Sequence, residues 1–466
     1  MARIALIKAG HAAVRQHFNP PLGIMSLASF LRDRVKGVEL KLIDMLPEGL
    51  SAKDAVERAL TFQPDVLGIS AMSYEAGELA LLAAASKARE PGLIVVAGGP
   101  HAATASGRVM EDPNIDYIVR GEGELTFLEM LPRLLAGDDD MGGVKGIGFR
   151  RNGAVVMTPA RDQTADMDSL SLPAYDLIDL SRYWDLPRFG TTFVHREYAT
   201  LSTSRACPYN CTYCHRIFGN RYRAQSPEIV LRDLESLRRE HGVKEILFVD
   251  DCFNLDRKRV AAICDGIVER GLKFSISFPN GIRGDLIEDE TLEKLKAAGA
   301  YRITYAIETA SPRIQKLVKK NVKLDKLKRV IEKTDALDVM VDGFFMVGFP
   351  GETRDEVRMT LDYALDSRLH SANFWFVTPF KGTELYEQAV AMGYKVPEQA
   401  EGMHYFDPGT DLSEVSAPEL KKMVRRTFLR FYLNPWRAWR IFKLFPNQRQ
   451  IPALFLRFLR FSLKWS

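Results

Sequence analysis

The sequence predicts an α/β protein with two parallel β-sheets and a helical carboxy-terminal segment. Apolar runs of strand length alternate twice along the chain with amphipathic helical stretches, which is the pattern of βαβ units. The chain has 466 residues and is 46% hydrophobic, which is more apolar material than one core uses, because single cores stop growing near about 250–300 residues. We therefore expect a first domain at 1–138, a linker at 139–195, a second domain at 196–392 and a carboxy-terminal segment at 393–466.

The first series predicts a doubly wound parallel sheet. Its predicted strands are 4–8, 39–44, 66–70, 93–97 and 117–119, and its predicted helices are 24–34, 52–61, 78–89 and 124–135. Ligands of such sheets bind beyond the carboxyl ends of the strands. The segments that follow these strands include PPLG, SAMSYEA, GGPHA and RGEGE, but no G-x-G-x-x-G follows the first strand. That absence argues against a nicotinamide or flavin dinucleotide.

The second series contains six strand–helix repeats, which suit a βα barrel or part of one, with its chemistry at the strand ends. Its predicted strands are 198–204, 245–251, 273–281, 302–309, 341–350 and 373–380. Between the two series the sequence is irregular and rich in prolines and acids, which predicts a linker. After about residue 392 the pattern lapses, and a tail rich in arginine and aromatic residues closes the chain.

Composition excludes several classes of protein. Five cysteines are too few for a disulfide framework in a chain of this length. The apolar runs are shorter than the roughly 18 residues that a membrane-spanning helix needs. The first ten residues, MARIALIKAG, predict a buried strand without a cleavage site. We therefore expect a cytoplasmic protein.

Three of the five cysteines, Cys207, Cys211 and Cys214, follow the first strand of the second series with C-x3-C-x2-C spacing. A closed zinc site needs four ligands, usually from two C-x2-C pairs, and the chain has no second pair. His215 directly follows Cys214, so its side chain would point away from a shared site. Three thiolates leave one iron of a 4Fe-4S cluster open to a substrate. The spacing therefore predicts a catalytic cluster, with zinc or pure electron transfer as the alternatives.

The cysteine motif, with the aromatic Tyr213 before its third cysteine, resembles that of the radical S-adenosylmethionine enzymes over about residues 196–392. This resemblance implies that the three cysteines hold a 4Fe-4S cluster and that its open iron binds S-adenosylmethionine. It also implies that reductive cleavage yields a 5'-deoxyadenosyl radical, which removes a hydrogen atom from the substrate. An electron donor such as flavodoxin or ferredoxin is then required.

The same resemblance assigns S-adenosylmethionine contacts to polar residues at the strand ends. They are Tyr213, Asp250, Asp251, Arg283, Glu308 and Ser311. Arg283 would pair with the carboxylate of S-adenosylmethionine, although a surface ion pair is the structural alternative. Cys252 is a candidate hydrogen-atom donor or a packed thiol, whereas Cys264 lies on an apolar helix face, as a buried cysteine would.

The strand ends of the first domain resemble those of the Rossmann-like cobalamin-binding domain that precedes many radical S-adenosylmethionine enzymes. The candidate cobalamin contacts are Ser70, Ala71, Met72, Gly98, Gly99, Pro100, His101, Gly121 and Glu122. Gly98 and Gly99 would admit the nucleotide tail, because a glycine allows close backbone approach. The D-x-H-x-x-G motif whose histidine ligates cobalt is missing, because His11 has Ala9 two residues before it and Val14 three after. The resemblance then implies that residues 70–72 lie next to the lower face of cobalt and that no histidine ligates it. His101 would instead form hydrogen bonds with the nucleotide tail or within its own loop.

Together the two resemblances imply a cobalamin-dependent radical S-adenosylmethionine methyltransferase that acts on an unactivated carbon of a small-molecule or lipid-like substrate. One alternative is a rearrangement, oxidation or cyclisation with the same cofactors, for example of a tetrapyrrole or a polycyclic isoprenoid. A non-enzymatic metal-binding protein is the remote alternative. A transfer-RNA methylthiotransferase would need three further cysteines near the amino terminus, and residues 1–195 contain none.

The tail differs in charge from the rest of the chain. Residues 421–466 hold 12 Lys and Arg, 11 aromatic residues and no acid, whereas residues 1–420 hold 52 Lys and Arg against 60 Asp and Glu. Arg457, Arg460 and Lys464 fall on one side of a predicted helix. We expect this helix either to lie in a bilayer interface, at the inner face of the membrane, or to pack on the acidic body. A bilayer contact would favour a membrane-resident substrate, and no other feature supports a nucleic-acid partner.

Overall fold

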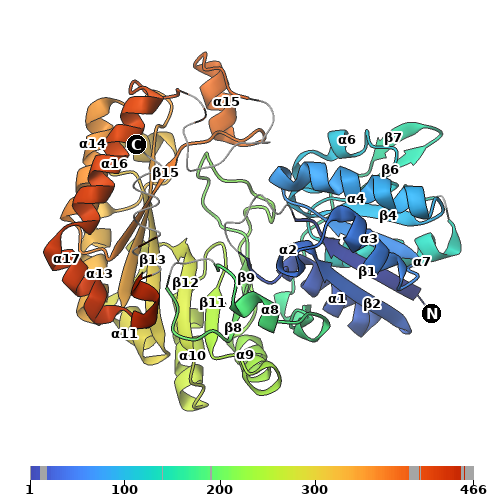
Figure 1. Ribbon diagram of the computed structural model, residues 1–466, viewed down its shortest axis with the longest axis horizontal. Helices are drawn as coiled ribbons and strands as arrows, with labels where there is room; N and C mark the ends of the chain where they lie inside the picture. Colours follow the sequence, from blue (N-terminus) through green and yellow to red (C-terminus); the bar gives the residue numbers. More distant parts are fainter. Residues whose placement is uncertain are drawn as a thin grey trace. The chain divides into compact units, whose positions relative to one another are not determined.

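The structure is a computed structural model, which describes residues 2–10, 18–138, 140–188, 192–397, 409, 411–452 and 456 (Figure 1). The chain forms two compact units. The first is made of Met1–Phe189 and Arg216–Gln225, and the second of Gly190–His215 and Ser226–Ser466. Residues 216–225 therefore follow the cysteine motif in sequence but belong to the first unit.

The first unit contains a seven-stranded sheet of order β2-β1-β3-β4-β5-β6-β7. Its strands are β1 (Ala2–Lys8), β2 (Val38–Asp44), β3 (Val66–Ser70), β4 (Ile94–Gly98), β5 (Tyr117–Val119), β6 (Ile147–Arg151) and β7 (Ala154–Met157). Strands β1 to β5 are parallel, as predicted. The chain winds outward in both directions from β1 and β3, so ligands are expected beyond the carboxyl ends of these two strands.

Helices cover both faces of this sheet (Figure 1). On one face α3 packs against α4, and on the other α1 packs against α7. Alternate strand residues such as Ala5, Ile7, Leu67 and Ile69 are buried toward α3 and α4, because successive side chains of a strand point to opposite faces. The helices of this unit are α1 (Leu22–Arg34), α2 (Met45–Glu48), α3 (Ala52–Leu60), α4 (Ala76–Arg89), α5 (Gly99–Thr104), α6 (Ser106–Val109), α7 (Gly123–Ala136) and α8 (Ser181–Trp184), and the short strand β10 is Arg223–Ala224.

The second unit contains six parallel strands in sequential order, β8-β11-β12-β13-β14-β15. This order is that of a partial βα barrel, as the six repeats predict. The strands are β8 (Tyr198–Leu201), β11 (Glu245–Phe248), β12 (Ser275–Ile282), β13 (Ala300–Glu308), β14 (Met340–Val347) and β15 (Ser371–Phe376), and the short β9 (Ser204–Arg205) follows β8.

Helices follow each strand of the barrel, and two more close the unit on its outer side (Figure 1). They are α9 (Pro227–His241), α10 (Arg257–Glu269), α11 (Asp289–Ala297), α12 (Pro312–Leu317), α13 (Leu324–Ala336), α14 (Arg354–Asp366), α15 (Glu384–Ala391), α16 (Ala417–Tyr432) and α17 (Pro435–Leu444). The described part of the carboxy-terminal segment contains the helices α16 and α17, as predicted, and α16 packs against α14. Among the helices that the structure describes, none has the length and apolarity to cross a membrane.

One part of the chain differs from the sequence-based description. The segment assigned to a linker contains β6 and β7, which extend the first sheet with antiparallel pairing. Asn152 and Gly153 join these strands with φ of 53° and 78°, and an Asn-Gly pair with positive φ is the strongest short signal for a hairpin. His11, Val14 and the tail residues Arg457, Arg460 and Lys464 lie outside the described residues.

Candidate active site

The cysteine loop lies at the carboxyl edge of the second sheet, directly after β8 and β9. Ala206 opens the loop in the left-handed region, with φ of 69°, and its amide donates a hydrogen bond to the carboxylate of Asp251 at 3.2 Å. Further along, the Thr212 amide donates to the carbonyl of Val318 at 3.1 Å. The loop is therefore fixed at its start and near its end, which positions the three thiols before any ligand binds.

The pKa values of the three thiols differ. A hydrogen bond from the Cys252 thiol lowers the pKa of Cys207 to about 6, and the backbone of Tyr209 contributes in the same direction. Desolvation raises the pKa of Cys211, and raises that of Cys214 to about 12. The Cys252 thiol is buried and hydrogen-bonded to Cys207, and both effects raise the pKa of Cys252. This fourth thiol therefore lies against the loop, next to one of the three clustered cysteines.

Lys320 places a positive charge next to all three thiols. Burial opposes the charge of this ammonium group, but Glu308 and the thiols outweigh burial and raise the pKa of Lys320. Its Nζ lies 3.4 Å from the Glu308 carboxylate. Glu308 has φ of 67° at the end of β13, where the pairing with β14 changes register. An ammonium group beside three thiols suits an anionic iron–sulfur cluster, whose charge it partly neutralises.

The thiol arrangement also bears on zinc. Within the described parts of the chain, no group of three or more His, Cys, Asp or Glu side chains converges on a single metal ion. A 4Fe-4S cluster places each thiolate on a different iron, so its thiols do not need a common point. A mononuclear zinc site does need one. The chain offers three cysteines in this loop and no second C-x2-C pair, which is the ligand set of a 4Fe-4S cluster with one open iron.

Arg283 joins the cysteine loop from the end of β12. Its guanidinium lies 3.8 Å from the centre of the Tyr209 ring and donates hydrogen bonds to Asp285 and to the Lys320 carbonyl, both at 2.9 Å. Its Nη1 is buried and finds no hydrogen-bond partner among the residues that the structure describes. A buried donor without a partner is costly, so this nitrogen is available to a carboxylate such as that of S-adenosylmethionine.

Other predicted contacts already bond to or pack against neighbouring groups, although Asp250 Oδ2 and the Tyr213 hydroxyl are buried without a hydrogen-bond partner among the described residues. Asp250 accepts hydrogen bonds from the amide and hydroxyl of Thr203 and from the hydroxyl of Ser204, at 3.1, 2.8 and 2.5 Å. Ser311 caps α12 and donates its hydroxyl to Glu356 at 2.8 Å. The ring of Tyr213 packs 6.4 Å from that of Phe349, and burial raises its pKa. These side chains shape the walls around the cysteine loop.

Sequence reasoning missed three residues near this edge: Lys320, Tyr209 and Glu352. Lys320 follows the helix α12 and not a strand, so no strand-end signal marks it. Glu352 accepts hydrogen bonds from the amides of Gly348 and Phe349 at 2.6 and 3.1 Å, and burial raises its pKa to about 7. The first glycine of GFPGE was a local signal for this turn, because Gly348 has φ of 89° and such a backbone conformation favours glycine.

In the first unit, the two adjacent glycines Gly98 and Gly99 have different surroundings. A Cβ on Gly99, where φ is 82°, would lie 2.6 Å from Ser70 Oγ and 3.0 Å from the Ala71 carbonyl oxygen. A Cβ on Gly98 would meet no atom within 4 Å in the described structure. The ends of β3 and β4 are also joined by a bond from the His101 amide to the Ala71 carbonyl, at 3.0 Å. Gly99 therefore permits close packing of the chain on itself, whereas Gly98 faces open space.

The remaining candidates of the first unit lie along the same edge. Gly121 has φ of 78° and open space beside it in the described structure, and Pro100 lies in the first turn of the helix α5. The Met72 amide donates to Glu75 at 2.8 Å. Glu122 is buried in an ion pair with Arg223 at 2.5 Å, and it also accepts a bond from the Thr164 amide at 3.3 Å. Its carboxylate therefore holds residues 216–225 on the first unit.

Sequence comparison gives two family matches within the chain. Residues 201–364 match the family described as the Radical SAM superfamily, and residues 10–131 match the family described as the B12 binding domain. The first range contains the cysteine loop, Arg283, Glu308 and Lys320. The second contains the glycine edge from Ser70 to Glu122. Each match therefore coincides with one of the two sites derived from the structure.

Curated relatives extend over most of the chain. A Pyrococcus horikoshii protein named as an uncharacterized methyltransferase is 33% identical over 419 residues, which is 89% of this chain and 88% of that protein. The cytidylyl-2-hydroxyethylphosphonate methyltransferase of Streptomyces wedmorensis is 28% identical, over 82% of this chain and 79% of that protein. The anaerobic magnesium-protoporphyrin IX monomethyl ester cyclase of Rubrivivax gelatinosus is 25% identical, over 89% of this chain and 74% of that protein.

Two solved structures share the fold. One is the radical S-adenosylmethionine methyltransferase TsrM of Kitasatospora setae, with a TM-score of 0.67 at 18% identity, covering 80% of this chain and 73% of that one. The other is the cobalamin-dependent S-adenosylmethionine radical enzyme OxsB, solved with aqua-cobalamin and S-adenosylmethionine, with a TM-score of 0.66 at 21% identity, covering 92% of this chain and 61% of that one.

Proposed function

The chain belongs to the cobalamin-binding radical S-adenosylmethionine enzymes, and on that premise we propose that it transfers a methyl group to an unactivated carbon of a small-molecule or lipid-like substrate. Membership brings a 4Fe-4S cluster, S-adenosylmethionine and cobalamin as cofactors. The observation that carries the proposal is the similarity, over 89% of the chain, to a protein named as a methyltransferase. The relative from Streptomyces wedmorensis carries the same class of activity in its name.

When bound, the cluster and S-adenosylmethionine supply hydrogen-atom abstraction, and cobalamin supplies a methyl group. The chain's own residues prepare the surroundings. Cys207, Cys211 and Cys214 would hold the cluster, and the Lys320 ammonium would offset its negative charge. The buried guanidinium of Arg283 would bind the carboxylate of S-adenosylmethionine through its unpartnered Nη1, held in place by the ring of Tyr209 beneath it.

Among the candidates of the first unit, Gly98 is best placed to accept cobalamin, because a Cβ there would point into open space. Gly121 offers the same freedom along that edge. Ser70, Ala71 and Gly99 would act by keeping the ends of β3 and β4 in close contact. We assign Glu122 a positioning role, since Arg223 and the Thr164 amide already occupy its carboxylate.

The test is incubation of the anaerobically reconstituted enzyme with reductant, candidate substrates and methyl-labelled S-adenosylmethionine. Methyl transfer predicts a product one carbon heavier that carries the label. Formation of 5'-deoxyadenosine with a product that gains no carbon would refute methylation. Cys264→Ala is the matched control for variants of the cysteine loop, because Cys264 is buried in α10.

A second candidate is a cyclisation or oxidation with the same cofactors. The similarity to the Rubrivivax gelatinosus cyclase over 89% of the chain favours it. The two functions differ in the mass of the product, since only methylation adds a carbon. In either case we propose that an external one-electron donor of the flavodoxin or ferredoxin class reduces the cluster.

A further inference from the structure

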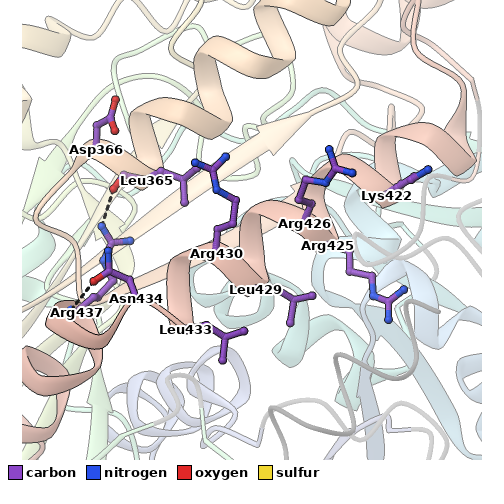
Figure 2. Close-up of a pocket in the computed structure, with 10 residues that line it drawn as sticks. All are labelled: Leu365, Asp366, Lys422, Arg425, Arg426, Leu429, Arg430, Leu433, Asn434 and Arg437. Carbon is purple, nitrogen blue, oxygen red and sulfur yellow. Dashed lines mark hydrogen bonds between the residues drawn. The ribbon is translucent and has the colours of Figure 1, made fainter.

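The outer side of α16 carries a basic groove of about 690 Å³, which Figure 2 shows with its lining residues. Lys422, Arg425, Arg426 and Arg430 project from α16 along this groove (Figure 2), and the acid in the lining is Asp366. The surrounding sequence has the same bias, since residues 420–452 contain nine Lys and Arg and no Asp or Glu. The groove is therefore a concentration of positive charge on the second unit.

Among the described residues, the cations of the groove differ from Arg440 and Lys443 because they form no ion pair with an acid. Arg440 pairs with Asp335 at 2.5 Å, and Lys443 pairs with Asp338 at 3.1 Å. For Arg426 and Arg430, no ion pair forms with any carboxylate in the described part of the chain. Uncompensated surface cations at this density attract anions.

The floor of the groove contains a buried guanidinium with free donors. Arg437 is 5% exposed, and its Nη2 donates to the carbonyls of Leu365 and Ser367, both at 2.8 Å. Its Nε and Nη1 are buried without a hydrogen-bond partner among the described residues. Burial and the nearby Arg440 lower the pKa of Arg437 to about 10. Buried donors without acceptors are costly, and this guanidinium adds a further positive charge to the lining of the groove.

An exposed aromatic ridge borders this groove. Leu433, Trp436, Trp439 and Phe442 are spaced three residues apart, and each is more than half exposed. The rings of Trp436 and Trp439 stack with their centroids 5.2 Å apart. Soluble proteins seldom expose such apolar patches unless these bind something, and tryptophan is enriched at the boundary between water and lipid. The ridge and the groove together form a surface with one apolar and one cationic part.

We propose that this surface of α16 and α17 binds an anionic phospholipid bilayer. Phosphate headgroups enter the basic groove above Arg437, while Trp436, Trp439 and Phe442 lie at the level of the headgroups and upper acyl chains. The chain continues from here into residues 453–466, which add Arg457, Arg460 and Lys464 and no acid. This attachment does not depend on which reaction the enzyme catalyses.

An acidic electron-donor protein could use the same charges, but the position of α17 argues against it. Arg437 and Arg440 bind the carbonyls of Ser367 and Arg368, just before β15, so α17 lies at the amino end of the second sheet. The cysteine loop lies at the carboxyl end. The strand β14 has eight residues and spans about 26 Å, so a donor docked on α17 would stand far from the cluster. A bilayer has no such requirement.

The experiment is cosedimentation of the full-length protein with vesicles of phosphatidylcholine alone and of phosphatidylcholine mixed with phosphatidylglycerol. We expect binding to the anionic vesicles that weakens as salt rises. The double variant Arg426→Glu/Arg430→Glu should bind at least tenfold more weakly, and Trp436→Ala/Trp439→Ala should also lose binding. The matched control Lys258→Glu/Lys273→Glu makes the same charge change at exposed residues elsewhere on the second unit and should bind like the wild type.

Four outcomes would overturn the proposal. One is equal binding to neutral and anionic vesicles, and another is equal loss in the groove variant and its control. The third is unchanged vesicle binding in the groove variant together with slower reduction of the cluster by flavodoxin, which would assign the surface to an electron donor. Inorganic phosphate added at the concentration of the lipid phosphate should not displace the protein from vesicles; displacement would mean that the groove binds free phosphate. Iron content and thermal unfolding of each variant confirm that it is folded.

Discussion

The carboxyl edges of the two sheets lie at equivalent positions of parallel α/β layers, but they differ in chemistry. The edge of the first sheet has the open space beside Gly98, and its half-buried Lys8 is neutralised by the buried Glu75 at 2.5 Å. The edge of the second sheet holds three thiols, the Lys320 ammonium and the unpartnered Nη1 of Arg283. The comparison shows that the same kind of sheet edge can suit two kinds of ligand. The first edge leaves space for a bulky ligand, and the second places cations where a charged ligand would bind.

The two solutions carry different costs. Room at a sheet edge requires residues without side chains, and such residues restrict folding because glycine loses more conformational entropy than other residues. Buried cations cost desolvation energy, which a counter-charge must offset. Glu308 supplies part of that counter-charge to Lys320. The second edge is therefore expected to respond to changes of charge and the first to changes of volume.

Removal of a thiol is the largest perturbation of the second edge. Cys211→Ala should lose the cluster and all cleavage of S-adenosylmethionine, because no other cysteine of the loop can replace the lost ligand. Iron and sulfide per chain, together with 5'-deoxyadenosine formation, measure the effect. Cys264→Ala should retain both. A Cys211→Ala protein with four irons and normal cleavage would show that the three cysteines do not hold the cluster.

Added volume tests the first edge. Gly98→Leu should weaken cobalamin binding at least tenfold while leaving the fold intact, because its side chain would fill open space. Gly99→Ala should instead destabilise the unit by about 2–3 kcal/mol, since φ is 82° and the new Cβ would press on Ser70 and Ala71. Corrinoid retained after desalting and the midpoint of thermal unfolding separate the two effects. Equal corrinoid content in Gly98→Leu and wild type would argue against a cobalamin contact there.

Loss of a charge tests the second edge without removing a ligand. Lys320→Met should lower the reduction potential of the cluster by roughly 50–100 mV, because a nearby positive charge favours the reduced form. Lys320→Arg keeps the charge and should stay close to wild type. Lys319→Met is the matched control, because Lys319 is the neighbouring residue and its side chain is exposed and pairs with Glu384. A redox titration followed by electron paramagnetic resonance gives the potentials, and an unchanged value in Lys320→Met would contradict the role of this ammonium.

The smallest effect is a pH dependence of stability at Glu352. Burial raises the pKa of this carboxyl from 4.5 to about 7 in the folded protein. The stability that the protonated Glu352 carboxyl gives to the folded protein is therefore fully present below pH 4.5 and is lost as the pH rises through 7. Glu352→Gln keeps an acceptor for Gly348 and Phe349 and cannot ionise, so it should gain on the order of 1–3 kcal/mol relative to wild type at pH 8. Thermal unfolding between pH 5 and 8, with the exposed Glu387→Gln as control, measures the difference; a constant offset across that range would refute it.

The sequence predicted most of the framework, because strands buried on both faces appear as apolar runs and the cysteine spacing is local. It could not separate Gly98 from Gly99, since their difference lies in what Ser70 and Ala71 place beside them. Lys320 was not predicted as a site residue, because only the fold brings a residue that follows α12 next to the thiols. The partner of Glu122 stands 101 residues away in the sequence, so its pairing carries no local signal. The Asn152-Gly153 hairpin was locally visible but lay inside a stretch assigned to a linker.

The return of residues 216–225 to the first unit has a consequence for biosynthesis. As the chain leaves the ribosome, Glu122 emerges about a hundred residues before Arg223, its buried ion-pair partner. A buried carboxylate without its partner costs several kcal/mol, so the first unit cannot reach its full stability until the cysteine motif has also been synthesised. A fragment cut at the apparent boundary near residue 195 would lack this partner. Gene fusions and domain exchanges that respect the folded protein should therefore carry the first unit together with everything up to residue 225.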